Sequence, residues 1–149
     1  MTSLSPLAAI LLAGVIAGTV DIGAASLIGG RDPVFISQYI AGGLLGKAAL
    51  EGGMQTAALG VALQWAMSIV IAAIYVIASR TLPVLRSQWP AMGILYGIPV
   101  QLVMTCVVVP LSAWHRPPHF VPVPFLENLA AMMVFGIIVA FFASRARAQ

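Results

Sequence analysis

The sequence predicts an all-α integral membrane protein with four transmembrane helices and one short amphipathic or re-entrant helix between the first and the second. Three observations support this fold class. Hydrophobic residues make up 61% of the 149 residues, charged residues make up only 7%, and the mean hydropathy is +1.05. A soluble domain carries about 25% charged residues. The apolar residues also form continuous runs, whereas the strands of a membrane β-barrel alternate at every second residue.

Four segments meet the length that a spanning helix requires. The hydrocarbon core of a bilayer is about 30 Å thick and each helical residue rises about 1.5 Å, so about 20 mostly apolar residues are needed. The first segment continues well beyond the apolar h-region of a signal peptide, has no Lys or Arg before it and shows no clear cleavage site, so we interpret it as a span. Within a single membrane domain of residues 1–149, we expect spans at residues 6–28, 54–79, 90–111 and 125–143.

Residues 33–50, between the first two spans, have two interpretations. Asp32 followed by Pro33 is typical of a helix start, and apolar residues then recur at helical spacing. Polar side chains such as Lys47, together with three glycines, make this segment a poor spanning helix. We expect a short amphipathic or re-entrant helix at the membrane surface or packed on the bundle, with a fifth span as the alternative.

The distribution of basic residues predicts the orientation, because Lys and Arg collect on the cytoplasmic side. The side that carries both termini has Arg80, Arg86, Arg145 and Arg147, and the opposite side has Arg31, Lys47 and Arg116. We therefore expect both termini in the cytoplasm.

The connection between the third and fourth spans, residues 112–124, is rich in proline. Proline fixes φ and lacks an N–H donor, so we expect this connection to be stiff and extended rather than helical. His115 and His119 lie within it, but the prolines between them prevent a helix from presenting both to a metal. A pH-sensing role for these imidazoles stays open.

Composition and motifs exclude several classes of protein. A net charge of +3 from seven Lys and Arg is too sparse for a nucleic-acid partner. A single cysteine, Cys106, excludes an internal disulfide framework and a cysteine-rich metal site. No phosphate-binding loop, nucleophile elbow or zinc-protease motif is present. We therefore expect no enzymatic activity, no cofactor and no metal.

Small and polar residues recur at helical spacing on one face of three spans. Small residues allow membrane helices to approach closely, so we expect internal packing faces, with a homodimer or a larger membrane complex as the alternative. The stripes comprise Gly14, Gly18, Asp21 and Ala25 on the first span, Gly60, Gln64, Ser68 and Tyr75 on the second, and Gly93, Gly97, Gln101 and Thr105 on the third.

Asp21 is the acidic residue inside a span. A carboxylate within a membrane helix costs several kcal/mol unless it is paired, protonated or facing water. Arg31 and Lys47 are its candidate ion-pair partners. One interpretation is a structural ion pair or a protonated, hydrogen-bonded acid. The other is an acid that handles a proton or a cation at the floor of an outward-facing polar pocket.

Gln64 and Gln101 lie about midway along the second and third spans. They would form either an amide pair between the two helices or, with Asp21, the lining for a small polar solute. Glu127 and Asn128 begin the fourth span, where an acid is favoured by the helix dipole. Capping is one interpretation of these two residues, and Glu127 is also the fourth candidate for the pocket.

An ordered set of residues in the second half of the chain carries a family resemblance. The set comprises Pro110, Pro117 and Pro118 with Phe120, and Glu127 with Asn128. Over residues 64–141 the chain resembles the YagU-like family of small bacterial inner-membrane proteins. The resemblance implies a helical protein of the bacterial inner membrane with a link to acid resistance.

The sequence therefore supports two hypotheses about function. The first is a membrane protein that binds or passes a proton or a small polar solute through the pocket around Asp21. The second is a non-catalytic accessory or scaffold subunit that holds a larger partner in the lipid bilayer through its glycine stripes and its proline-rich loop.

Overall fold

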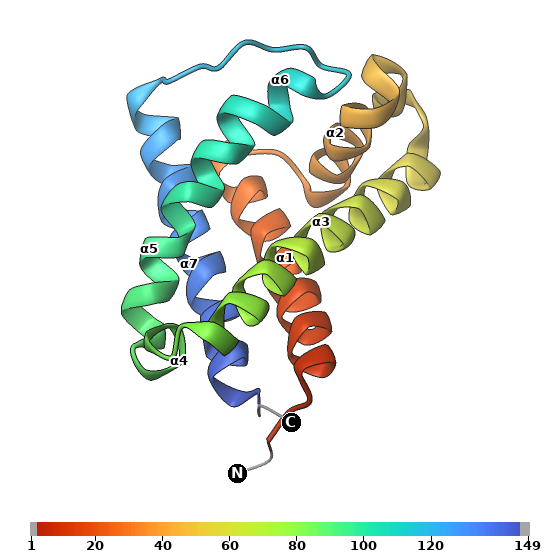
Figure 1. The fold of residues 1–149 in the computed structure, drawn as a ribbon. Coiled ribbons are helices and arrows are strands. Elements are labelled where there is room, and N and C mark those ends of the chain that lie inside the picture. The colour runs from red at the N-terminus through yellow and green to blue at the C-terminus, as the bar shows by residue number, and fades with distance from the viewer. Residues whose placement is uncertain (1–2, 147–149) are drawn as a thin grey trace.

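Four long helices form the body of the molecule. The computed structural model describes residues 3–146, and Figure 1 shows the long helices running between the two ends of the bundle. Each is long and apolar enough to cross a membrane, which confirms the all-α fold class and the four expected spans. The spans are α1 (Pro6–Gly29), α3 (Gly53–Thr81), the helical stretch Trp89–Leu111 and α7 (Pro122–Arg145).

Shorter helical segments occupy the two ends. α2, the 3-10 helix η1 and α6 lie at one end, which we call the loop end (Figure 1). α4 lies at the other, the terminal end, where the Leu4 N–H donates to the Arg145 carbonyl at 3.0 Å. The segments are α2 (Pro33–Leu45), η1 (Gly46–Glu51), α4 (Val84–Ser87) and, within the third span, α5 (Trp89–Val103), the π-helical η2 (Met104–Val108) and α6 (Val109–Leu111). Arg147, one of the basic residues expected at the terminal end, lies outside the described residues.

The outer faces of the spans are apolar and open. Val70, Ile74 and Ile77 along α3 are 56 to 61% exposed, and Leu95 on α5 is 54% exposed. Contiguous apolar surface of this kind is typical of a face that contacts lipid or a partner. Together with the four spans, it fits a multi-pass protein surrounded by a lipid bilayer.

α2 is a short helix packed on α3. Its start at Asp32 is confirmed, since the Asp32 carboxylate accepts a hydrogen bond from the Phe35 N–H at 2.9 Å. Its 13 residues extend over about 20 Å, too short to cross the hydrocarbon core. The alternative of a fifth span is therefore wrong. The Ser37 carbonyl of α2 lies directly against Gly60 of α3, where no side chain would fit.

The glycine stripes lie inside the bundle. α5 packs on α7 so closely that a Cβ on Gly93 would lie 2.7 Å from the Gly136 carbonyl oxygen, and one on Gly97 would lie 2.5 Å from the Met132 carbonyl oxygen. On α1, Gly14 contacts the backbone of Ile69, and a Cβ on Gly18 would lie 2.7 Å from the Ser68 hydroxyl. Small residues permit these approaches. These glycines thus contact neighbouring helices of the same chain and do not lie on the outer surface, where a second protein would bind.

α7 begins three residues earlier than expected, at Pro122. Proline suits the first helical position, because its fixed φ matches the helix and its missing N–H has no partner there in any case. Glu127 and Asn128 consequently lie within α7 and not at its start, so their interpretation as caps is wrong. Residues 115–121 are non-helical, as expected for the proline-rich connection.

Candidate functional site

A cavity of about 410 Å³ lies between α1, α3, the third span and α7, toward the loop end. Its volume is within the range of roughly 300–1,000 Å³ that small-molecule sites occupy. Asp21 of α1, Gln64 of α3 and Gln101 of α5, three residues selected from the sequence, all line it. Its further polar lining is Ser68, Thr105, His119 and Asn128, and most of the remaining wall is methionine, phenylalanine and aliphatic side chains.

Asp21 and Gln64 are joined across the α1–α3 interface. Gly18 lets the two helices approach, and one turn further along α1 the Gln64 Nε2 donates to Asp21 Oδ2 at 2.8 Å. Among the described residues, Asp21 Oδ1 accepts no hydrogen bond, yet no buried side-chain oxygen lacks a partner. Oδ1 is therefore accessible and not buried, and Asp21 is one of the side chains that line the cavity.

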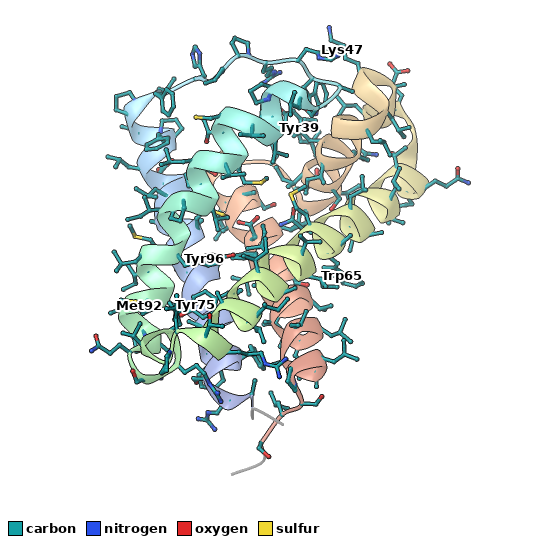
Figure 2. All side chains as sticks on the ribbon, in the orientation of Figure 1. Tyr39, Lys47, Trp65, Tyr75, Met92 and Tyr96 are labelled. Atoms are coloured by element: carbon teal, nitrogen blue, oxygen red, sulfur yellow. The ribbon has the colours of Figure 1, made fainter. Side chains whose placement is uncertain are left out.

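The expected ion pair between Asp21 and Arg31 or Lys47 is wrong. Within residues 3–146 the Asp21 carboxylate contacts Gln64 and neither cation. Asp21 lies eight residues, or about 12 Å along the helix axis, before the end of α1. Arg31 is exposed beyond that end with its guanidinium 4.9 Å from the centre of the Phe35 ring. Lys47 lies in η1 and points away from the bundle (Figure 2).

The expected amide pair between Gln64 and Gln101 is also wrong. The Gln64 amide donates to Asp21, and the Gln101 Nε2 donates to the Thr105 hydroxyl at 3.3 Å, one turn along its own span. α3 packs on α1 and α2, whereas α5 packs on α7. The two glutamines consequently line the same cavity from separate pairs of helices.

Glu127 does not line the cavity and is exposed, whereas its neighbour Asn128 lines it. Successive residues on a helix are rotated by about 100°, so the two side chains point in different directions. The Asn128 Nδ2 donates to the Pro124 carbonyl at 2.8 Å, which holds the amide at the cavity wall. Asn128 therefore takes the place in the pocket that we expected for Glu127.

Irregular helix geometry in the third span places Thr105. Pro110 has no N–H, and its ring would clash with the Cys106 carbonyl in a regular α-helix. The chain widens at this point into the π-helical turn η2, where the Val109 N–H donates to the Met104 carbonyl five residues back. Single π-helical turns occur frequently at functional sites. Thr105, within this turn, lines the cavity.

The proline-rich loop is fastened to α2 through Trp114. Trp114 stacks on Tyr39 with ring centroids 4.6 Å apart, and its Nε1 donates to the Tyr39 carbonyl at 3.1 Å. The Trp114 indole lies directly against Gly42, and the Arg116 guanidinium lies 5.6 Å from the centre of the Trp114 ring. The loop is thereby held against α2, and the exposed His119, further along it, forms part of the cavity lining.

Of the residues that carry the family resemblance, Asn128 lines the cavity. Pro110 follows η2, and Phe120 packs edge-to-face on Phe125 with centroids 5.4 Å apart. Pro117 and Pro118 lie in the extended loop before His119.

The sequence did not identify His119 as part of the lining. Its neighbouring prolines break helical periodicity, so no pattern in the sequence could assign it to a face.

The chemistry of the site is that of a binding cavity. It offers one acidic oxygen, several amide and hydroxyl groups and a mostly apolar wall. Within residues 3–146, no three His, Cys, Asp or Glu side chains gather closely enough to hold a metal ion. Comparisons of this chain with protein-family models, curated proteins and solved structures found no match.

Proposed function

We propose that this membrane protein binds, and passes, a proton or a small polar solute through the cavity around Asp21. One observation carries the proposal: a carboxylate within a spanning helix lines a cavity of about 410 Å³, and among residues 3–146 its Oδ1 accepts no hydrogen bond and is not buried. An acid in this setting is costly, and such acids mark proton and solute pathways in membrane proteins. Gln101, Thr105 and Asn128 supply further groups that can hydrogen-bond a solute.

Filling the cavity tests this function. Ala25 lines the cavity, and Ala25→Phe would occupy part of its volume. The protein is reconstituted into lipid vesicles, where a trapped pH-sensitive dye reports proton entry and light scattering reports the entry of glycerol or urea. We expect the wild-type protein to carry at least one of these fluxes and Ala25→Phe to lower it at least about tenfold, because bulk replaces solvent space.

Gly23→Phe is the matched control, since a side chain on Gly23 of α1 meets open space. We expect this variant to carry the wild-type flux. If the wild-type protein carries none of the three fluxes, or if Ala25→Phe carries them at the wild-type rate, the proposed function is wrong.

We also propose that the terminal end is cytoplasmic and that the membrane is the bacterial inner membrane. Arg80, Arg86 and Arg145 collect at the terminal end, as cytoplasmic basic residues do. The cavity then opens to the outer side. The resemblance to the YagU-like family supports this location and suggests a role in acid resistance.

A further inference from the structure

An apolar groove of about 290 Å³ lies between α3 and the third span, beside the cavity. Four residues line both spaces: Met67, Ile71, Val100 and Met104. The groove and the cavity therefore share a wall of flexible or aliphatic side chains. At its far side the groove is lined by Val70, Ile74 and Val103, which are 51 to 59% exposed on the outer surface of the bundle.

Two tyrosines, Tyr75 of α3 and Tyr96 of α5, hold the two helices together at one end of this groove. The Tyr96 hydroxyl donates to the Ile71 carbonyl at 2.8 Å, and the Tyr75 and Tyr96 rings meet edge-to-face at 4.9 Å (Figure 2). Each of the two helices otherwise packs on other helices, α3 on α1 and α2 and α5 on α7. The groove thus forms a side opening on the outer surface of the bundle, and the side chains that it shares with the cavity separate it from Asp21.

The charged side chain that lines the cavity is acidic. Among residues 3–146, Asp21 is the acidic side chain in its lining, and no Lys or Arg is a lining residue. A carboxylate that remains unpaired in an apolar span is unfavourable, so a bound positive charge would stabilise it. Phe125 and Phe135 also line the cavity, and aromatic faces attract organic cations. Methionine side chains, of which Met67, Met104 and Met132 line the wall, adapt to apolar groups of different shape.

We infer that the solute of this cavity is a small organic monocation with an apolar body, which enters sideways from the bilayer through the α3–α5 groove and pairs with the open oxygen of Asp21. This inference rests on the proposed function, whose solute class it names. The apolar body matches the groove and the methionine-rich wall. The cationic head matches the single carboxylate.

Binding of benzyltrimethylammonium to the full-length protein in detergent tests the inference, with titration calorimetry as the measurement. We expect saturable binding to the wild-type protein and at least about tenfold weaker binding to Asp21→Asn, because one charge pair is lost. Glu127→Gln removes a carboxylate outside the cavity and should bind like the wild-type protein. Phenylacetate, an anion of similar shape, should not bind.

A separate variant tests entry through the side opening. Val103 lines the groove but not the cavity, so Val103→Trp should slow the uptake of the cation from vesicle membranes while leaving its Kd in detergent unchanged. Equal uptake rates for Val103→Trp and the wild-type protein would contradict the side opening.

Two outcomes overturn the assignment of a cation: no binding to the wild-type protein, or equal binding to Asp21→Asn. Either result leaves the proposed function standing if the proton, glycerol or urea flux is still blocked by Ala25→Phe. If that flux is absent as well, both proposals fail.

Discussion

Asp21→Asn is expected to lower the flux of the wild-type protein at least about tenfold, since an intramembrane acid on a proton or solute pathway is functional and costly to replace. Asparagine has the size of aspartate, but it can neither take up a proton nor balance a positive charge. Its amide oxygen can still accept the 2.8 Å hydrogen bond that Gln64 now donates to Asp21. The α1–α3 contact should therefore survive, and the loss should concern transport and not folding.

Two measurements separate these effects. Flux is followed in reconstituted vesicles, and the unfolding midpoint is followed by circular dichroism in detergent, where the free energy of unfolding should change by no more than about 1.5 kcal/mol. Glu127→Gln, which neutralises an exposed carboxylate outside the cavity, should leave both unchanged. An Asp21→Asn protein that folds and carries the wild-type flux would show that the acid has no part in transport.

Gly136→Ala is expected to destabilise the protein by about 3 kcal/mol, the upper part of the range for overpacking a well-packed core. A single Cβ on Gly136 would be placed directly on the Gly93 carbonyl, and a Cβ on Gly93 or Gly97 of α5 would meet the backbone of α7 in turn. Because backbone atoms and not a flexible side chain are in contact, α5 and α7 would have to separate.

Gly23→Ala is the matched control for this substitution. It adds the same methyl group to a spanning helix at a position with nothing within 4 Å, and it should be neutral or stabilise the helix by up to about 1 kcal/mol. The two variants are compared by their unfolding midpoints in detergent. Equal stability of Gly136→Ala and the wild-type protein would contradict the close α5–α7 packing.

The spans could be predicted from the sequence because bilayer thickness sets the length of an apolar run. The start of α7 was missed because the prolines at 122 and 124 were interpreted as loop residues, although proline is also favoured in the first turn of a helix. The short length of α2 followed from its polar side chains and glycines, which the sequence displays directly.

Three members of the site were predictable, but their pairings were not, and Glu127 was wrongly included. Asp21, Gln64 and Gln101 stand out because polar groups in apolar spans must find partners or water. Which partner each finds depends on which helices pack together, and this is decided by backbone contacts such as Gly14 with Ile69 and Gly97 with Met132. Helical spacing identifies the faces of such contacts but not the opposing helix.

Access of water to the cavity is measured most directly by cysteine labelling of intact vesicles. The native thiol is first removed by Cys106→Ser, because Cys106 is exposed. Thr105→Cys then places a thiol at the cavity, and Val107→Cys places one two residues away, on the outer face where Val107 is 46% exposed. Thiols react with maleimides as thiolates, which require water. We predict that a membrane-impermeant maleimide modifies Thr105→Cys and leaves Val107→Cys unmodified; an unreactive Thr105→Cys, or equal modification of both, would contradict a water-filled cavity at Asp21.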